Sequence, residues 1–232
     1  MNITIDKASS RGHAYYGWLN SCHTFSFASY IHPDRMNFGA LRVLNDDTVA
    51  PSEGFDTHPH KNMEIVSIPL SGKLRHGDNL SNSHVISRGD IQVMSAGTGI
   101  SHSEFNASAT ESLSFLQIWV IPDRTNTTPK YRDYDIKPLL KHNEISTFLA
   151  PGTEIAIMQQ AWFSWADLDR GVKRKYKLKG QNTGVYLFVI EGEIRIGKTV
   201  LQRRDGASIT DADSISLEAD QNSTVLIMEV AM

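Results

Sequence analysis

Short apolar runs closed by turn residues dominate this sequence and constrain its fold more than any other feature. They are rich in Val, Ile, Leu and Phe and end at Gly, Asn, Asp or Ser. This pattern is typical of the strands of a sandwich or barrel. No amphipathic helix longer than two turns is expected, so the sequence predicts an all-β protein. The main runs lie at 40–45, 64–72, 84–97, 112–121, 184–197, 214–219 and 224–230.

A weak internal repeat divides the chain into two halves. The stretch GKLR at 72–75 resembles GEIR at 192–195, and RGDI at 88–91 resembles RDGA at 204–207. Between the halves, the polar segment 122–135 contains two prolines, as a linker would. The repeat therefore predicts two β-barrel domains, one spanning 1–130 and the other 131–232.

Composition and charge exclude several classes of function. The formal net charge is −3 and the pI is near 6.3, so no global basic field favours nucleic acid or a membrane surface. No run approaches the roughly 18 apolar residues of a spanning helix, and the N-terminus lacks the apolar stretch of a signal peptide. The single cysteine, Cys22, cannot form an internal disulfide, which fits a reducing compartment. We therefore expect a cytoplasmic protein.

Two pairs of polar residues indicate a metal site. His58 and His60 lie two apart in FDTHPHKNMEI, and His102 and Glu104 lie two apart in GISHSEFN. On a strand, residues i and i+2 share one face at a Cα separation of about 6.5–7 Å. An H-x-H pair alone also occurs on strands that bind nothing. Two pairs on neighbouring strands would converge, and three imidazoles with one carboxylate suit Fe, Mn, Co, Ni, Cu or Zn with a position left open.

The second half lacks these residues. The repeat offsets carry the first pair to Leu178 and Gly180 and the second pair to Ala219 and Gln221. We therefore expect one metal site, in the first domain.

Several further residues are candidates for the surroundings of the metal. Continued alternation from His58 would place Asn62 and Glu64 on the inward face, where they would hydrogen-bond the ligand imidazoles, unless the strand bends at Pro59. Phe25 and Gln117, with Phe27 and Phe115, are candidates for lining a pocket, although the aromatic residues are also typical of a core.

Two polar segments are expected at the surface. His76 and His84 border the loop sequence HGDNLSNSH, which predicts solvent-exposed imidazoles. The triplet Asn45-Asp46-Asp47 between apolar runs is typical of a turn.

The sequence resembles the cupin superfamily through two motifs. GFDTHPHKNMEIVSIPLSG is similar to the first cupin motif, and GDIQVMSAGTGISHSEFN is similar to the second. Within the cupins, the match is to pirin and the bacterial pirin-like proteins. It is carried by RGHAYYGWLNSCHTFSFASY, FGALRVLNDD, LQIWV and the two motifs, which cover most of the first 121 residues.

This resemblance implies a bicupin, with two jelly-roll-like barrels and one metal, normally iron, in the first. The ligands would be His58, His60, His102 and Glu104, and the second barrel would hold no metal. In many cupins the Glu after H-x-H is a ligand, and Glu64 occupies that place. The pirin pattern implies Glu104 as the ligand and Glu64 as a neighbour of the site or an interior residue.

The resemblance also implies an activity. Several pirins are associated with quercetin 2,3-dioxygenase activity, in which O2 opens the heterocycle of a flavonol and carbon monoxide leaves. Glu104, a carboxylate beside the metal, would be the base. The alternative is a redox-sensing regulatory protein that acts through a protein partner, as implied by the link of the eukaryotic pirin to transcriptional regulation. A purely structural metal is a third reading, which an open coordination position disfavours.

Overall fold

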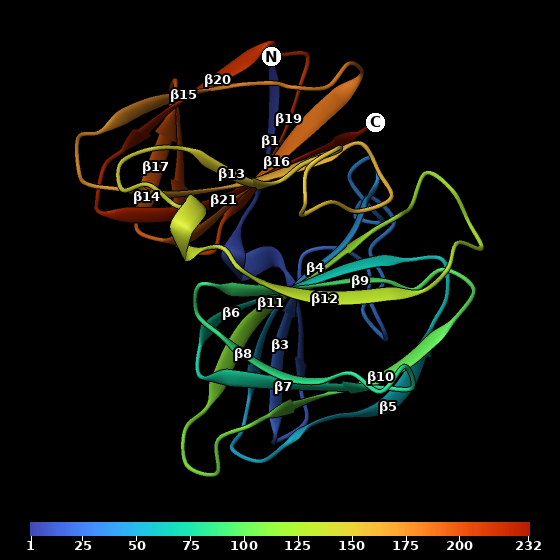
Figure 1. Cartoon of the computed structure of the whole chain (residues 1–232). Helices are drawn as coiled ribbons and strands as arrows, with labels where there is room; N and C mark the ends of the chain where they lie inside the picture. Colours follow the sequence, from blue (N-terminus) through green and yellow to red (C-terminus); the bar gives the residue numbers. More distant parts are fainter.

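The protein consists almost entirely of antiparallel β-sheet arranged as two barrels, which lie one above the other in Figure 1. The computed structural model describes residues 1–232. Each barrel is made of two sheets, as the all-β prediction requires. The only helical elements are the short 3-10 turns η1 (Ala8–Ser10) and η2 (Lys137–Leu139), and no helix has the length and apolar character needed to cross a membrane.

The first barrel combines a seven-stranded sheet, in the order β12-β9-β6-β11-β4-β3-β2, with a four-stranded sheet, β5-β10-β7-β8. Its strands are β2 (Gly12–Tyr15), β3 (Leu19–His23), β4 (Leu41–Val49), β5 (Gly54–His60), β6 (Glu64–Ser71), β7 (Lys73–Asp78), β8 (Ser83–Ser87), β9 (Asp90–Ser95), β10 (Ile100–Asn106), β11 (Leu113–Val120) and β12 (Lys130–Asp135).

The second barrel combines a six-stranded sheet, in the order β1-β19-β16-β21-β14-β13, with a four-stranded sheet, β15-β20-β17-β18. Its strands are β1 (Asn2–Asp6), β13 (Ser146–Leu149), β14 (Ala161–Leu168), β15 (Lys173–Lys177), β16 (Thr183–Glu191), β17 (Glu193–Ile196), β18 (Thr199–Gln202), β19 (Gly206–Thr210), β20 (Ser214–Ala219) and β21 (Ser223–Ala231).

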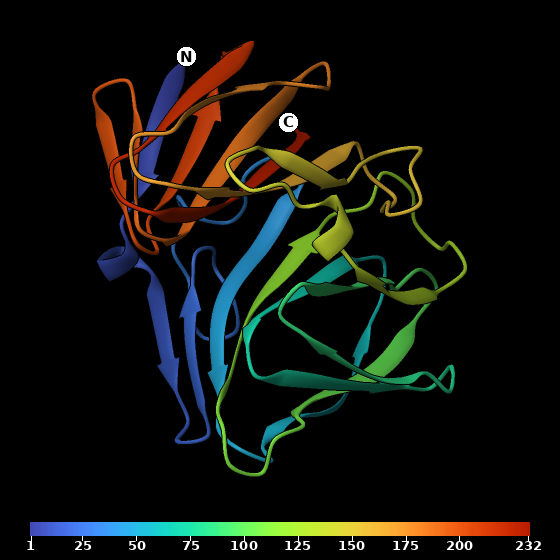
Figure 2. The ribbon, with the colours of Figure 1, turned by 60° about the vertical axis from the view of Figure 1, so that its left-hand side comes forward.

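The sheets do not divide at the predicted boundary between residues 130 and 131. The N-terminal strand β1 pairs with β19 and so belongs to the second barrel, where it lies beside the C-terminal strands in Figure 2. The strand β12, within the segment predicted to be a linker, pairs with β9 of the first barrel. Its prolines precede the strand, and Tyr131 and Tyr134 supply side chains that pack on the barrel. Each barrel is therefore completed by a segment from beyond its own half of the chain.

A continuous apolar core joins the two barrels. It contains 26 buried residues, and they come from both large sheets. Leu44, Val66 and Ile118 contribute from the first barrel, and Phe163 and Tyr186 contribute from the second. The same strands of the first barrel turn their alternate residues inward, because successive side chains of a strand point to opposite faces. The shared core thus fixes which residues of β4, β6 and β11 face the barrel interior.

Residues 41–49 form one unbroken strand, β4, so the turn predicted at Asn45-Asp46-Asp47 is wrong. Asn45 and Asp47 are buried, at 1% and 2% exposure, whereas Asp46 pairs with Arg11 on the opposite face of the sheet. Alternation in the middle of a strand explains this arrangement of polar residues. It brings two of them into the first barrel.

Candidate metal centre

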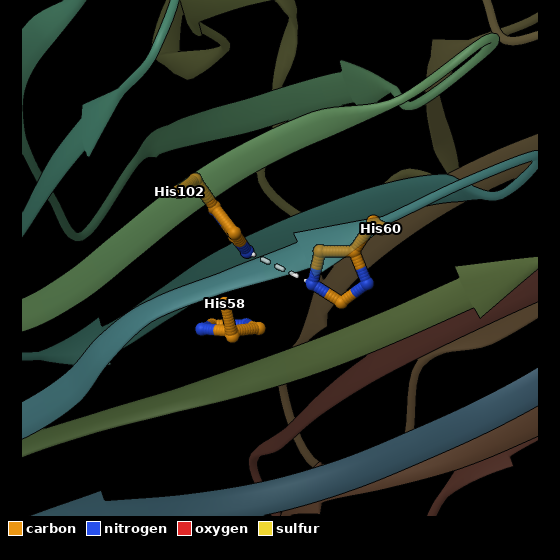
Figure 3. A group of neighbouring side chains, drawn as sticks. All are labelled: His58, His60 and His102. Carbon is orange, nitrogen blue, oxygen red and sulfur yellow. Dashed lines mark hydrogen bonds between the residues drawn. The ribbon is translucent and has the colours of Figure 1, made fainter.

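Three histidines converge inside the first barrel. His58 and His60 lie two apart on β5, and His102 lies on the neighbouring strand β10, directly opposite His58 in the antiparallel register. β10 alternates strictly between buried and half-buried residues, which turns His102 and Glu104 to the same inward face. Each of the three imidazoles offers a nitrogen within 4.8 Å of the others (Figure 3). The predicted convergence of the two strands therefore occurs for the histidines.

The spacing of these nitrogens fits a metal ion. The Nε2 atoms of His60 and His102 are 3.0 Å apart, the pair joined by the dashed line in Figure 3. Imidazole nitrogens bind transition metals at about 2.0–2.1 Å, and two such ligands at right angles around one ion lie about 3 Å apart. The Nδ1 atom of His58 donates to the backbone oxygen of Asp56 at 2.7 Å, which leaves its Nε2 atom free as a donor to a metal.

Burial keeps two of the three imidazoles in the form that binds metals. Burial, and then the neighbouring imidazoles His102 and His58, lower the pKa of His60 to about 4. Burial, followed by His58 and His76, lowers the pKa of His102 to about 3. Near neutral pH both rings are therefore uncharged, and an uncharged ring carries the lone pair that a metal requires.

Glu104 lies inside the same barrel, but its carboxylate is not among the atoms within 4.8 Å of one another. Its Oε1 accepts hydrogen bonds from Ser67 Oγ at 2.9 Å and Gln92 Nε2 at 3.2 Å, and its Oε2 accepts one from Gln117 Nε2 at 2.8 Å. Gln117 therefore contacts the carboxylate itself, and this group of donors orients Glu104 within the barrel.

The predicted hydrogen bonds from Asn62 and Glu64 to the ligand imidazoles are absent. Asn62 has a left-handed backbone, with φ of +50°, in the short connection that leads from β5 to β6 in the other sheet. Alternation cannot continue through such a connection. Asn62 Oδ1 accepts from the backbone of Asn126, and Glu64 Oε2 accepts from Ser95 Oγ and from the backbone of Met158. Burial raises the pKa of Glu64, and its bond to Met158 ties the side chain to the second half of the chain.

Phe25 also lies away from the site. It is buried in the core between the barrels, with its ring centroid 5.4 Å from that of Tyr186. The aromatic side chain that does flank the histidines is Trp119 on β11, which packs edge-on against His60 at a centroid distance of 4.9 Å. Phe27 packs in turn against Trp119. Trp119 belongs to the LQIWV motif, but its residue type alone could not distinguish it from an aromatic residue of the core.

His76 is buried at 1% exposure, so its prediction as a solvent-exposed residue is wrong. It stacks on Tyr131 of β12 at a centroid distance of 3.9 Å, and its Nε2 atom lies 2.9 Å from Asp78 Oδ2. Its Nδ1 atom lies 3.4 Å from Nδ1 of the ligand candidate His102. The alternation of Leu74 and His76 in β7 could have placed His76 inward, but the polar loop after it obscured the strand. His84, on the next strand, is exposed as predicted.

Asp47 is a further buried acid that sequence analysis missed. It accepts a hydrogen bond from Ser21, which lies across the neighbouring strand β3. Burial raises the pKa of Asp47 to about 7, and the charges of Asp46 and Glu104 contribute in the same direction. The interior of this barrel therefore holds a second carboxyl group within electrostatic reach of Glu104.

Comparison with known proteins identifies the family. Residues 4–120 match the family model described as Pirin, and residues 150–230 match the one described as Quercetinase C-terminal cupin domain. The chain is 38% identical over 229 residues to an Escherichia coli protein named quercetin 2,3-dioxygenase, covering 98% of both chains. It is also 38% identical over 227 residues to a Caulobacter vibrioides pirin-like protein, covering 95% of this chain and 96% of that protein.

A solved structure of a bacterial pirin from Escherichia coli in complex with nickel(II) is similar throughout. The TM-score is 0.93 at 37% sequence identity, and 99% of each chain is covered. A quercetin 2,3-dioxygenase from Acinetobacter baumannii, at 20% identity and a TM-score of 0.79, shares the fold. The expected bicupin architecture is confirmed, and the chain belongs to the pirin family.

Proposed function

We propose that this protein is a metal-dependent dioxygenase of the quercetin 2,3-dioxygenase type. The observation that carries the proposal is the group of three inward histidines, in a chain that matches a named quercetin 2,3-dioxygenase over almost its full length. The substrates would be O2 and a small aromatic molecule of the flavonol class. The regulatory alternative gains no support, because the relatives that match over the full chain include named enzymes.

We propose that one divalent transition metal binds His58, His60 and His102, with Glu104 as the fourth ligand. Imidazole nitrogens with one carboxylate suit Fe(II), and they also accept Mn, Co, Ni, Cu or Zn. Fe(II) is our assignment, since dioxygen chemistry is best served by a redox-active metal. A rotation of Glu104 away from Ser67 and Gln92 would free Oε1 for the ion while Gln117 continues to hold Oε2.

The residues of the chain suggest how a flavonol would be activated. The bound metal would supply positive charge that lowers the pKa of the flavonol 3-hydroxyl and fixes its orientation. Glu104 would accept the hydroxyl proton, and the amide of Gln117 would keep its carboxylate aimed at the substrate. O2 would then add to C2 and C4, the O–O, C2–C3 and C3–C4 bonds would break, and C3 would leave with its oxygen as carbon monoxide.

The substrate would approach at the edge formed by β5. His58 and His60 are half-buried there, whereas His102 is fully buried. The main surface cavities, including one of about 700 Å³ beside Tyr131, are not lined by these histidines. A flavonol would therefore lie against the half-buried edge, with the indole of Trp119 beside His60 as an aromatic neighbour. We also propose a cytoplasmic location, which the single free thiol of Cys22 supports.

The test is single and direct. Protein loaded anaerobically with Fe(II) is given quercetin and then air, and both flavonol absorbance and released carbon monoxide are followed. We expect turnover by the wild type, loss of turnover in His102→Ala, and unchanged turnover in His84→Ala, whose side chain is exposed on β8 and separated from β10 by β7. If wild type with full metal occupancy is as inert as His102→Ala, the dioxygenase proposal fails.

A further inference from the structure

Asp78 is the last residue of β7, and both oxygens of its carboxylate accept hydrogen bonds. Its Oδ1 accepts from the backbone N–H groups of Leu80 and Asn82, and its Oδ2 accepts from Asn82 Nδ2 and His76 Nε2. Burial alone would raise the pKa of Asp78, but these hydrogen bonds together outweigh it and lower the pKa. An ionised carboxylate can only accept. His76 must therefore carry a proton on Nε2.

That proton determines what the other nitrogen of His76 can do. With that proton on Nε2, Nδ1 of His76 is the ring nitrogen that can accept a hydrogen bond. The facing atom is Nδ1 of His102, 3.4 Å away, at the long end of the hydrogen-bonding range. His102 then donates its Nδ1 proton to His76, which leaves the lone pair of His102 on Nε2. This is the atom that lies 3.0 Å from Nε2 of His60.

The surroundings hold His76 in this orientation. The side chains of His76 and Asp78 are fully buried. The ring of Tyr131 lies parallel to His76, with 15° between the planes. Tyr131 lies on β12, the edge strand that pairs with β9 in the seven-stranded sheet. A ring that is stacked on one face and hydrogen-bonded at both nitrogens has little freedom to rotate.

We propose that His76 and Asp78 are positioning residues that fix the tautomer of His102, so that its Nε2 lone pair faces the metal. The inference rests on the metal site of the proposed function. Metal-binding histidines commonly donate their distal N–H directly to a carboxylate or a backbone carbonyl. Here a second imidazole stands between the ligand and the carboxylate, so the turn after β7 controls the ligand through two hydrogen bonds.

Two substitutions at one position separate this role from packing. His76→Phe keeps a ring against Tyr131 but removes the acceptor that faces His102. His76→Asn loses the stacked ring but places Oδ1 near the position of Nδ1. His84→Phe is the control, because His84 is paired with His76 on the adjacent strand, is exposed, and has no contact with His102.

The affinity for Co(II) and Zn(II) is measured by chelator competition, together with the visible spectrum of the cobalt protein. We expect a loss of about 10–100-fold in His76→Phe, the range typical of lost outer hydrogen bonds to a ligand histidine. His76→Asn should lie nearer to wild type, and His84→Phe should equal it. Unchanged affinity and spectrum in His76→Phe, or a greater loss in His76→Asn than in His76→Phe, would overturn the proposal.

Tautomers are read directly by long-range ¹H–¹⁵N NMR of the wild type. We expect a proton on Nε2 of His76 and on Nδ1 of His102; a proton found on Nδ1 of His76 contradicts the inference. This measurement needs neither quercetin nor turnover. It therefore tests the role of His76 and Asp78 in metal-free protein even if the dioxygenase proposal fails. A protein that binds metal but lacks turnover would not contradict this role.

Discussion

The two barrels share a strand pattern but fill their interiors differently. The second barrel encloses 16 buried apolar residues. The first barrel holds two small apolar clusters, of six and four buried residues, together with the buried polar groups of His76, Gln92, His102, Glu104 and Gln117. At the positions where the repeat would carry the two ligand pairs, the second barrel has Leu178, Gly180, Ala219 and Gln221. An apolar interior stabilises the fold, whereas a polar interior is stable only when its groups are hydrogen-bonded to one another.

Glu104 of the first barrel and Glu229 of the second are nevertheless both almost fully buried, and the two differ in their partners. Glu229 of β21 accepts from Tyr176 Oη, from Thr183 Oγ1 and from the backbone N–H groups of Lys179 and Gly180. Backbone donors tie it to the 179–183 loop. Glu104 instead accepts only from side chains, which can reorient. One carboxylate is thus part of the framework, and the other is free to take part in chemistry.

The largest effect is expected for Glu104→Gln. The substitution keeps the shape of the side chain but removes its charge and its basicity. Turnover of quercetin should fall by about 10²- to 10⁴-fold, the usual contribution of a positioned base, which corresponds to about 3–5 kcal/mol. The measurement is steady-state turnover together with metal content. The control is Gln221→Glu, at the repeat-related position, which should leave turnover unchanged. Turnover within threefold of wild type at equal metal content would remove Glu104 from the mechanism.

The matched change in the second barrel, Glu229→Gln, should alter stability in place of activity. The amide keeps one oxygen for the N–H groups of Lys179 and Gly180, but it loses the negative charge that strengthens these bonds, and its nitrogen cannot accept from Tyr176 Oη. We expect a loss of about 2 kcal/mol in the free energy of unfolding, with turnover per folded molecule preserved. Urea denaturation measures the loss. The surface substitution Glu218→Gln, which breaks the exposed pair with Lys173, should cost well under 1 kcal/mol. A stable but inactive Glu229→Gln protein would contradict the division between the barrels.

The sequence sufficed to predict the parts of the site that depend on local periodicity. Strict alternation along β10 brought His102 and Glu104 to one face, and the H-x-H of β5 lies beside His102 as expected. The same reasoning failed at Asn62, because a left-handed residue ends the alternation before Glu64. Periodicity holds only within a strand, and the sequence alone does not mark where the chain leaves one sheet and enters the other.

The remaining features depend on contacts between distant segments. Phe25 faces the second barrel because the 26-residue core lies there, and Tyr131 reaches His76 because β12 pairs with β9. Both contacts depend on how the sheets pack. The polar composition of 122–135 also concealed a strand whose two tyrosines face the protein. Residues that surround the ligands were therefore harder to predict than the histidines themselves.

The smallest effect concerns Asp47 and its pH dependence. Its pKa is about 7 in the folded protein and near 3.8 when unfolded, so the folded state binds the proton more tightly. This tighter proton binding contributes to the free energy of unfolding. The contribution is complete below about pH 4 and is lost as the pH rises through 7, at up to about 1.4 kcal/mol per pH unit. Asp47→Asn keeps an acceptor for Ser21 but cannot ionise, so it should lack this loss. Between pH 6 and 7, its free energy of unfolding should gain about 1 kcal/mol relative to wild type. Parallel pH profiles for the two proteins in urea denaturation would show that Asp47 is already ionised in the folded barrel.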